Sequence, residues 1–174
     1  MDAAKSKAAG LMLMGFDVDG VLTDGSLIYS SQGDELKAFS SLDGHGLKML
    51  ASAGVKLAII TGRTSRAVEL RAQNLGITLL LQGVEDKRSA MAKLLESLGL
   101  GFEQAGYMGD DVVDLPLMRA CGFSATVADG HSLLNQHADY AARKNGGHGA
   151  VREVCEFILG AQGKLDAALE MYLL

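Results

Sequence analysis

The segment LMLMGFDVDG, residues 11–20, joins a short apolar run directly to the acidic sequence Asp17-Val18-Asp19-Gly20. An apolar run that stops at Asp-x-Asp-Gly predicts a buried strand ending in a loop. Four further short apolar runs predict strands at residues 55–61, 78–81, 104–108 and 123–127. Helical patterns occupy residues 46–53, 65–75, 87–98, 115–120 and 150–162. Short apolar strands that alternate with helices predict an α/β fold, with a parallel sheet covered on both faces.

Length and composition predict one globular domain over residues 1–174. The chain has 174 residues, 48% of them hydrophobic, and a formal net charge of −5. Two cysteines are too few for a disulfide scaffold or a four-thiolate zinc site, which favours a reducing, cytoplasmic setting. No apolar run reaches the ~18–20 residues of a membrane span, and residues 11–16 are too few for a secretory signal. The acidic balance argues against nucleic-acid binding.

Two segments fall outside the alternation of strands and helices. Residues 22–39 have alternating residues around the polar sequence Ser31-Gln32-Gly33-Asp34, which predicts a β-hairpin insertion. Residues 163–174 form a tail of mixed pattern, compatible with a helix, a mobile tail or an interface strand.

Polar residues follow the predicted strands where each strand ends. The first run ends in Asp17 and Asp19, the second in Thr61, and the fourth in Asp110, while Lys87 opens the helix after the third. The carboxyl ends of parallel strands meet at one edge of a sheet, where ligands bind. Clustered carboxylates repel one another unless a cation joins them, and an all-oxygen site suits Mg²⁺. We therefore expect Asp17 and Asp110 to bind Mg²⁺. The sequence does not distinguish Mg²⁺ from Mn²⁺ or Co²⁺ as the bound metal.

These residue types suit phosphoryl transfer. Asp17 can act as the nucleophile, and Asp19 can give a proton to the leaving group and take one from water. Thr61 and Lys87 can stabilise charge on the phosphoryl oxygens. Each residue alone fits a turn, a helix cap or a solvated surface position. Only the order, the spacing and the position at strand ends, taken together, favour a catalytic site.

The motifs resemble those of the haloacid dehalogenase superfamily of aspartyl-phosphate phosphatases. The segment from Asp17 to Asp24 is similar to the first motif, and Thr61, Lys87 and Gly109-Asp110-Asp111 match the second, third and fourth in order. The resemblance implies a Rossmann-like core and a phosphoric monoester hydrolase. It also implies that the backbone carbonyl of Asp19 binds the metal.

A closer resemblance leads to the 3-deoxy-D-manno-octulosonate 8-phosphate phosphatases of lipopolysaccharide synthesis, over about residues 11–166. It is carried by residues 61–63, 75–78, 109–116, 127–129, 146–155 and 161–166. This family implies Mg²⁺ dependence, a hairpin in place of a cap, and a homotetramer whose neighbouring subunits complete each active site. It further implies that Asp111 and Asp114 support the water molecules on the metal.

The same resemblance implies a set of residues that bind the phosphorylated sugar acid. Beside Asp19 and Lys87, the set contains Ser40, Ser41, Leu42, Asp43, Gly44, Lys48, Gly62, Arg63 and Arg71. The planar guanidinium of Arg63 can pair bidentately with the sugar's carboxylate. Relatives that act on nine-carbon sialic-type 9-phosphates tend to have glutamate at this position, so Arg63 favours the eight-carbon substrate. The family often has arginine where this chain has His148, and an anion contact from that histidine would depend on pH. The alternative is that His148 only packs or faces water.

Two other functions compete with the phosphatase. A receiver-like signalling module also uses an aspartate cluster, a threonine, a lysine and Mg²⁺, but its phospho-accepting aspartate follows the third strand. Here residues 81–83 after that strand contain no aspartate. A homologue that has lost activity and serves only in assembly would not need Asp17, Asp19, Lys87 and Asp110 together.

Overall fold

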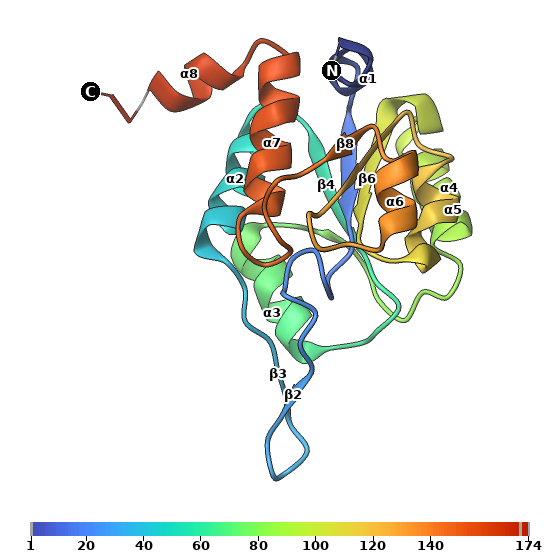
Figure 1. Ribbon diagram of the computed structural model, residues 1–174, viewed down its shortest axis with the longest axis vertical. Coiled ribbons are helices and arrows are strands. Elements are labelled where there is room, and N and C mark those ends of the chain that lie inside the picture. The colour runs from blue at the N-terminus through green and yellow to red at the C-terminus, as the bar shows by residue number, and fades with distance from the viewer. Residues whose placement is uncertain (1, 171, 174) are drawn as a thin grey trace.

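A computed structural model describes residues 2–170, 172 and 173 of the chain. Its centre is a parallel six-stranded sheet in the order β5-β4-β1-β6-β7-β8 (Figure 1). The strands are β1 (Leu13–Phe16), β4 (Lys56–Ile60), β5 (Leu79–Leu81), β6 (Ala105–Gly109), β7 (Phe123–Thr126) and β8 (Tyr140–Ala141). The chain runs outward from β1 to β5 and then returns to β6 on the other side. This reversal puts a topological switch point beside β1, where such folds bind ligands.

Helices cover both faces of the sheet, as the sequence predicts (Figure 1). One apolar cluster joins the sheet to α1 (Asp2–Ala9), α2 (Ser41–Ser52), α3 (Arg66–Leu75) and α7 (Ala150–Ala161). The other cluster joins it to α4 (Lys87–Leu98), α5 (Leu115–Met118) and α6 (Ser132–His137). Short 3-10 turns lie at Phe102–Gln104 and Val112–Asp114.

The predicted hairpin is confirmed and stands apart from the sheet. Strands β2 (Ile28–Tyr29) and β3 (Glu35–Leu36) pair antiparallel, and the polar turn lies between them. Figure 1 shows the hairpin projecting from the molecule at the end opposite to α1 and α8 (Leu165–Glu170). None of the helices in the described residues has the length and apolarity that a bilayer crossing requires.

Several elements differ from those that the sequence predicts. Helix α2 begins five residues early, because the Ser40 hydroxyl accepts a hydrogen bond from the Asp43 backbone N–H and caps the helix. Gly46 in its second turn lies against α7, where an added Cβ would be 2.9 Å from the Arg152 Cα. Because glycine stands at such a helix–helix contact, the first turns of α2 lack the periodic apolar residues that would predict a helix. The sequence does not predict helices α1 and α6 or the two-residue strand β8, since these elements are short or bury few side chains.

The C-terminal tail, for which the sequence leaves three alternatives, forms helix α8 over Leu165–Glu170. Its partly buried side chains Leu165, Ala168 and Leu169 pack against the apolar cluster beneath α7. Met171 and Leu174 of the tail lie outside the described residues.

Candidate active site

Asp17 lies directly after the central strand, and the loop that follows turns sharply. Its backbone N–H donates to the Met108 carbonyl of β6 at 3.0 Å, and one carboxylate oxygen accepts from the Val18 N–H at 2.7 Å. Gly20 has φ +87°, and a Cβ there would lie 2.1 Å from Oδ2 of Asp110. Glycine is therefore required where the first motif meets the fourth.

Lys87 holds two buried carboxylates together. Its Nζ lies 2.7 Å from Oδ2 of Asp17 and 2.6 Å from Oδ1 of Asp114, which is fully buried. The other oxygen of Asp114 accepts from the backbone N–H groups of Asp110 and Asp111 at 3.1 and 3.3 Å. Asp114 thus fixes both Lys87 and the backbone of the fourth motif.

Three carboxylates form a group suited to a metal ion. Asp17, Asp110 and Asp114 each offer an oxygen within 4.8 Å of the others. Burial, followed by the negative charge of Asp114, raises the pKa of Asp17 to about 6 and that of Asp110 to about 7. Three ionised carboxylates and one ammonium leave a net charge of −2, which a divalent cation would balance. The all-oxygen donor set fits Mg²⁺.

An open pocket of about 580 Å³ lies above this group. Its lining unites the predicted residues Asp17, Asp19, Thr61, Gly62, Arg63, Lys87, Asp110 and Asp111. Thr61 is buried at the end of β4, and its backbone bonds to Leu81 and Val84 (3.0 Å each) fix it there. The pocket therefore contains an acidic floor, a buried hydroxyl and two cationic side chains.

The hairpin reaches this pocket through its charged residues. Lys37 pairs with Oδ1 of Asp19, while Nη2 of Arg63 donates to Glu35 at 2.8 Å and to the Tyr29 hydroxyl at 2.9 Å. Sequence reasoning assigned no role to Lys37, Glu35 or Tyr29. The signal available was spacing, since Lys37 follows β3 directly and lies two residues after Glu35, the separation at which side chains of an extended chain share a face.

The other predicted sugar-binding residues lie outside this pocket in the folded chain. Ser40, Ser41 and Leu42 line a separate groove of about 500 Å³, beside His148 and Phe39. Arg71 donates to the Ser40 carbonyl at 2.8 Å, and Gly44 lies against its guanidinium.

Asp43 is used by the fold. Its buried carboxylate accepts from the backbone N–H groups of Gly149 at 3.3 Å and Arg152 at 2.9 Å, at the start of α7. Both oxygens are thereby engaged and the side chain is buried, so it is not accessible to a substrate bound to the same chain.

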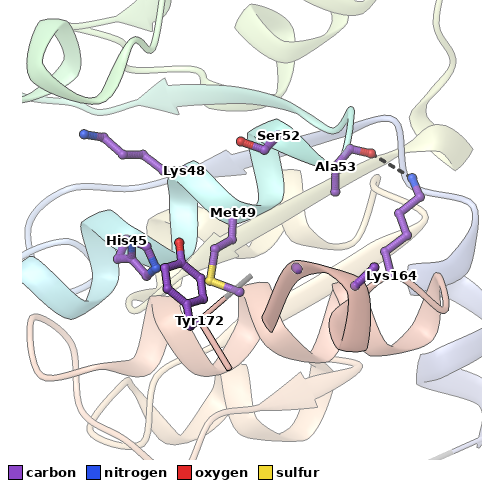
Figure 2. Close-up of a pocket in the computed structure, with 9 residues that line it drawn as sticks. His45, Lys48, Met49, Ser52, Ala53, Lys164 and Tyr172 are labelled. Carbon is purple, nitrogen blue, oxygen red and sulfur yellow. Dashed lines mark hydrogen bonds between the residues drawn. The ribbon is translucent and has the colours of Figure 1, made fainter. Parts of the chain in front are cut away.

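Lys48 belongs to another groove, of about 530 Å³, between α2 and the C-terminal segment (Figure 2). His45 meets the Tyr172 ring edge-on there, with centroids 5.4 Å apart, and Lys164 donates to the Ala53 carbonyl at 2.8 Å (Figure 2). This groove is distinct from the pocket above Asp17.

Known proteins match this chain over nearly its whole length. A sequence profile of haloacid dehalogenase-like hydrolases matches residues 80–154. The 3-deoxy-D-manno-octulosonate 8-phosphate phosphatase KdsC of Escherichia coli K12 is 48% identical over 163 residues, which cover 94% of this chain and 87% of the relative.

Solved structures agree with this match. A probable YrbI family phosphatase from Pseudomonas syringae pv. phaseolica superposes with a TM-score of 0.98 at 48% identity, covering 100% of this chain and 99% of that one. The 3-deoxy-D-manno-octulosonate 8-phosphate phosphatase of Moraxella catarrhalis, in complex with a magnesium ion, a phosphate ion and a KDO molecule, gives 0.97 at 45% identity. It covers 99% of both chains.

Proposed function

The chain belongs to the 3-deoxy-D-manno-octulosonate 8-phosphate phosphatase family of haloacid dehalogenase-like hydrolases, and we propose that it hydrolyses this sugar phosphate to 3-deoxy-D-manno-octulosonate (KDO) and phosphate. The observation that carries the proposal is the pocket that unites Asp17, Asp19, Thr61, Lys87 and Asp110. The enzyme is a Mg²⁺-dependent phosphomonoesterase that supplies KDO for lipopolysaccharide precursors. Mn²⁺ and Co²⁺ accept similar oxygen donors and are expected to substitute.

Asp17 is the nucleophile in the proposed mechanism. One of its oxygens attacks phosphorus, the bond from phosphorus to the sugar oxygen breaks, and the phosphoryl group passes to Asp17. Asp19 gives the departing sugar oxygen a proton. Asp19 then takes a proton from the water that attacks phosphorus, which releases phosphate and restores Asp17.

The surrounding residues hold the phosphoryl group and the metal. Asp17, Asp110 and the Asp19 backbone carbonyl would bind Mg²⁺, and Asp111 would support its water molecules. Asp114 would support the site indirectly, through Lys87 and the backbone of Asp110 and Asp111. When bound, Mg²⁺ neutralises negative charge on the nucleophile and the phosphoryl oxygens. Lys87 and Thr61 stabilise the charge that develops on the transferring group. Because Lys87 also pairs with Asp17, its ammonium is already placed beside the nucleophile.

Arg63 is the proposed partner of the sugar's carboxylate, with Gly62 beside it. Its guanidinium lines the pocket and is 43% exposed, so it is accessible to a ligand. A neutral sugar lacks the carboxylate with which this guanidinium would pair, so it should bind less well. A related nine-carbon sugar acid 9-phosphate is the alternative substrate.

The hairpin supports assembly into a homotetramer. Leu27, Ile28, Tyr29 and Leu36 are 44–56% exposed, which is unusual for four neighbouring large apolar side chains. Burial of these residues against other copies would remove this apolar surface from water. It would also bring neighbouring subunits to the open side of each pocket. Ser40, Ser41, Leu42, Lys48 and Arg71 would then contact the sugar acid of a neighbouring subunit, since they lie outside the chain's own pocket. Asp43 and Gly44 are buried and would support this surface without contacting the ligand.

We further propose that the described elements act as a single cytoplasmic phosphatase domain. All six parallel strands share one sheet, and Cys121 and Cys155 are free thiols.

Measurement of molar mass by light scattering tests the tetramer directly. A Leu27→Ser/Leu36→Ser double variant should lower the mass if the hairpins form the interface. A monomeric wild-type protein that is fully active would contradict the assembly proposal.

A phosphate-release screen tests the activity itself. The panel contains the eight-carbon and nine-carbon keto sugar acid phosphates and a neutral hexose phosphate, with Mg²⁺ present. We expect the eight-carbon substrate to have the highest kcat/KM. The Asp17→Asn variant should lose activity by at least about 10³-fold, whereas Asp2→Asn, at an exposed position of helix α1, should not change it. A neutral hexose phosphate that gives the highest kcat/KM would refute the role of Arg63, and an active Asp17→Asn variant would refute covalent catalysis.

A further inference from the structure

Lys37 is a buried cation in an exposed hairpin. Its side chain is 1% exposed, although Leu36 beside it is 54% exposed. Removing an ammonium group from water is costly unless anionic partners compensate. The partners of Lys37 are Oδ1 of Asp19, in direct contact, and Oε1 of Glu35, at 3.5 Å. The hairpin therefore directs one lysine to the carboxylate assigned to proton transfer.

Asp19 is held at both of its oxygens. Lys37 contacts Oδ1, and Nε of Arg63 lies 3.7 Å from Oδ2. Glu35 links the two cations, because its Oε1 also accepts from Nη2 of Arg63 at 2.8 Å. A carboxylate with partners on both oxygens has fewer accessible rotamers than one facing water. Arg63, at 43% exposed, is the partner that a substrate can reach, whereas Lys37 remains enclosed.

We propose that Lys37 is a positioning residue for the reaction, and that it fixes the Asp19 carboxylate in line with the leaving oxygen of the substrate. The inference rests on the proposed function, in which Asp19 protonates that oxygen. Lys37 acts through Asp19 and does not itself contact the phosphoryl group. A displacement of about 1 Å in a catalytic group can lower a rate by about 100-fold, so the loss of such a contact is measurable.

The dependence on the leaving group separates positioning from a general structural role. A sugar alkoxide needs a proton as it leaves, whereas the nitrophenolate of p-nitrophenyl phosphate is stable without one. For both substrates kcat/KM reports the steps up to transfer of the phosphoryl group to Asp17. Misplacement of Asp19 should therefore lower kcat/KM for the sugar phosphate much more than for the nitrophenyl ester.

The experiment compares Lys37→Met with wild type on both substrates in the presence of Mg²⁺. We expect kcat/KM to fall by between about 10- and 100-fold on the sugar phosphate and by less than about threefold on p-nitrophenyl phosphate. Lys37→Arg, which keeps a cation, should recover most of the loss. Lys7→Met removes another ion-paired lysine, bound to Asp139, and should leave both values unchanged.

The ratio of the two losses decides the outcome. A sugar phosphate loss at least threefold larger than the nitrophenyl ester loss, and present in kcat, supports the assignment. A smaller ratio overturns it, as does a loss confined to KM, which a displaced Arg63 would cause through Glu35. If Lys37→Met does not fold, as judged by circular dichroism, Lys37→Gln is measured against the same ratio. Failure of the proposed function gives a different result, since the wild-type enzyme would then turn over p-nitrophenyl phosphate but not the sugar phosphate.

Discussion

Replacement of Lys87 by methionine tests whether this residue balances the charge of the acidic group. Methionine preserves most of the length of the side chain but leaves the carboxylates of Asp17 and Asp114 without their ammonium partner, 2.7 and 2.6 Å away. Asp114 is fully buried, and Lys87 is 6% exposed. Removal of one partner of a buried ion pair typically costs about 3–5 kcal/mol. We expect the free energy of unfolding, without metal at pH 7.5, to fall by that amount.

Denaturant unfolding at a fixed protein concentration measures this change. The matched control is Lys93→Met, because Lys93 is exposed on the same helix and its replacement should alter stability by less than about 0.5 kcal/mol. Mg²⁺ should stabilise the Lys87→Met variant more than the wild type, since the acidic group then has one more uncompensated negative charge. Turnover of the sugar phosphate should fall by at least 10²-fold even with saturating Mg²⁺.

A double variant distinguishes the loss of charge balance from a loss of packing. In Lys87→Met/Asp114→Asn one buried negative charge is also removed, so at least about 1 kcal/mol of the lost stability should return. If Lys87→Met is no less stable than Lys93→Met, or if the second substitution destabilises the protein further, Lys87 does not balance the buried carboxylates.

Two further predictions concern protons and the fold beneath the site. Burial raises the pKa of Asp17 to about 6 and of Asp110 to about 7, so the metal-free folded state retains protons between pH 4 and 7 that the unfolded state has released. Stability without metal should therefore decrease as pH rises through 6–7. Mg²⁺ must displace these protons, and calorimetry should show its affinity falling by at least tenfold from pH 8 to pH 5.5. A pH-independent affinity would contradict the charge assignment. Asp43→Ala should lower the free energy of unfolding by about 2–3 kcal/mol in denaturant titrations and leave KM within about threefold, because its oxygens accept from the start of α7. A tenfold rise in KM with unchanged stability would instead indicate a substrate contact.

Much of the fold could be predicted from local sequence. Five of the six strands of the central sheet and the hairpin produce short apolar or alternating runs that end in recognisable loops. Strand β8 and helix α6 could not be predicted in this way, because two strand residues and fewer than two helical turns do not establish a period. The start of α2 was also missed, since its first turns carry Gly44 and Gly46 in place of large apolar residues.

The sequence by itself determined the chemistry that this protein offers. Asp17, Thr61, Lys87 and Asp110 follow apolar runs or open the helix after one, and parallel strands bring such positions to one edge of the sheet. Their convergence could thus be inferred from order and spacing alone.

Only the tertiary structure decided how charge is arranged around these residues. The pairing of Lys87 with Asp114, of Lys37 with Asp19, and of Asp43 with the start of α7 joins positions 27, 18 and more than 100 residues apart. Such contacts depend on side-chain direction and burial after folding, and local patterns carry no record of them. The sequence therefore identified the reactive groups, whereas packing determined which cation holds each carboxylate and which carboxylates face the ligand.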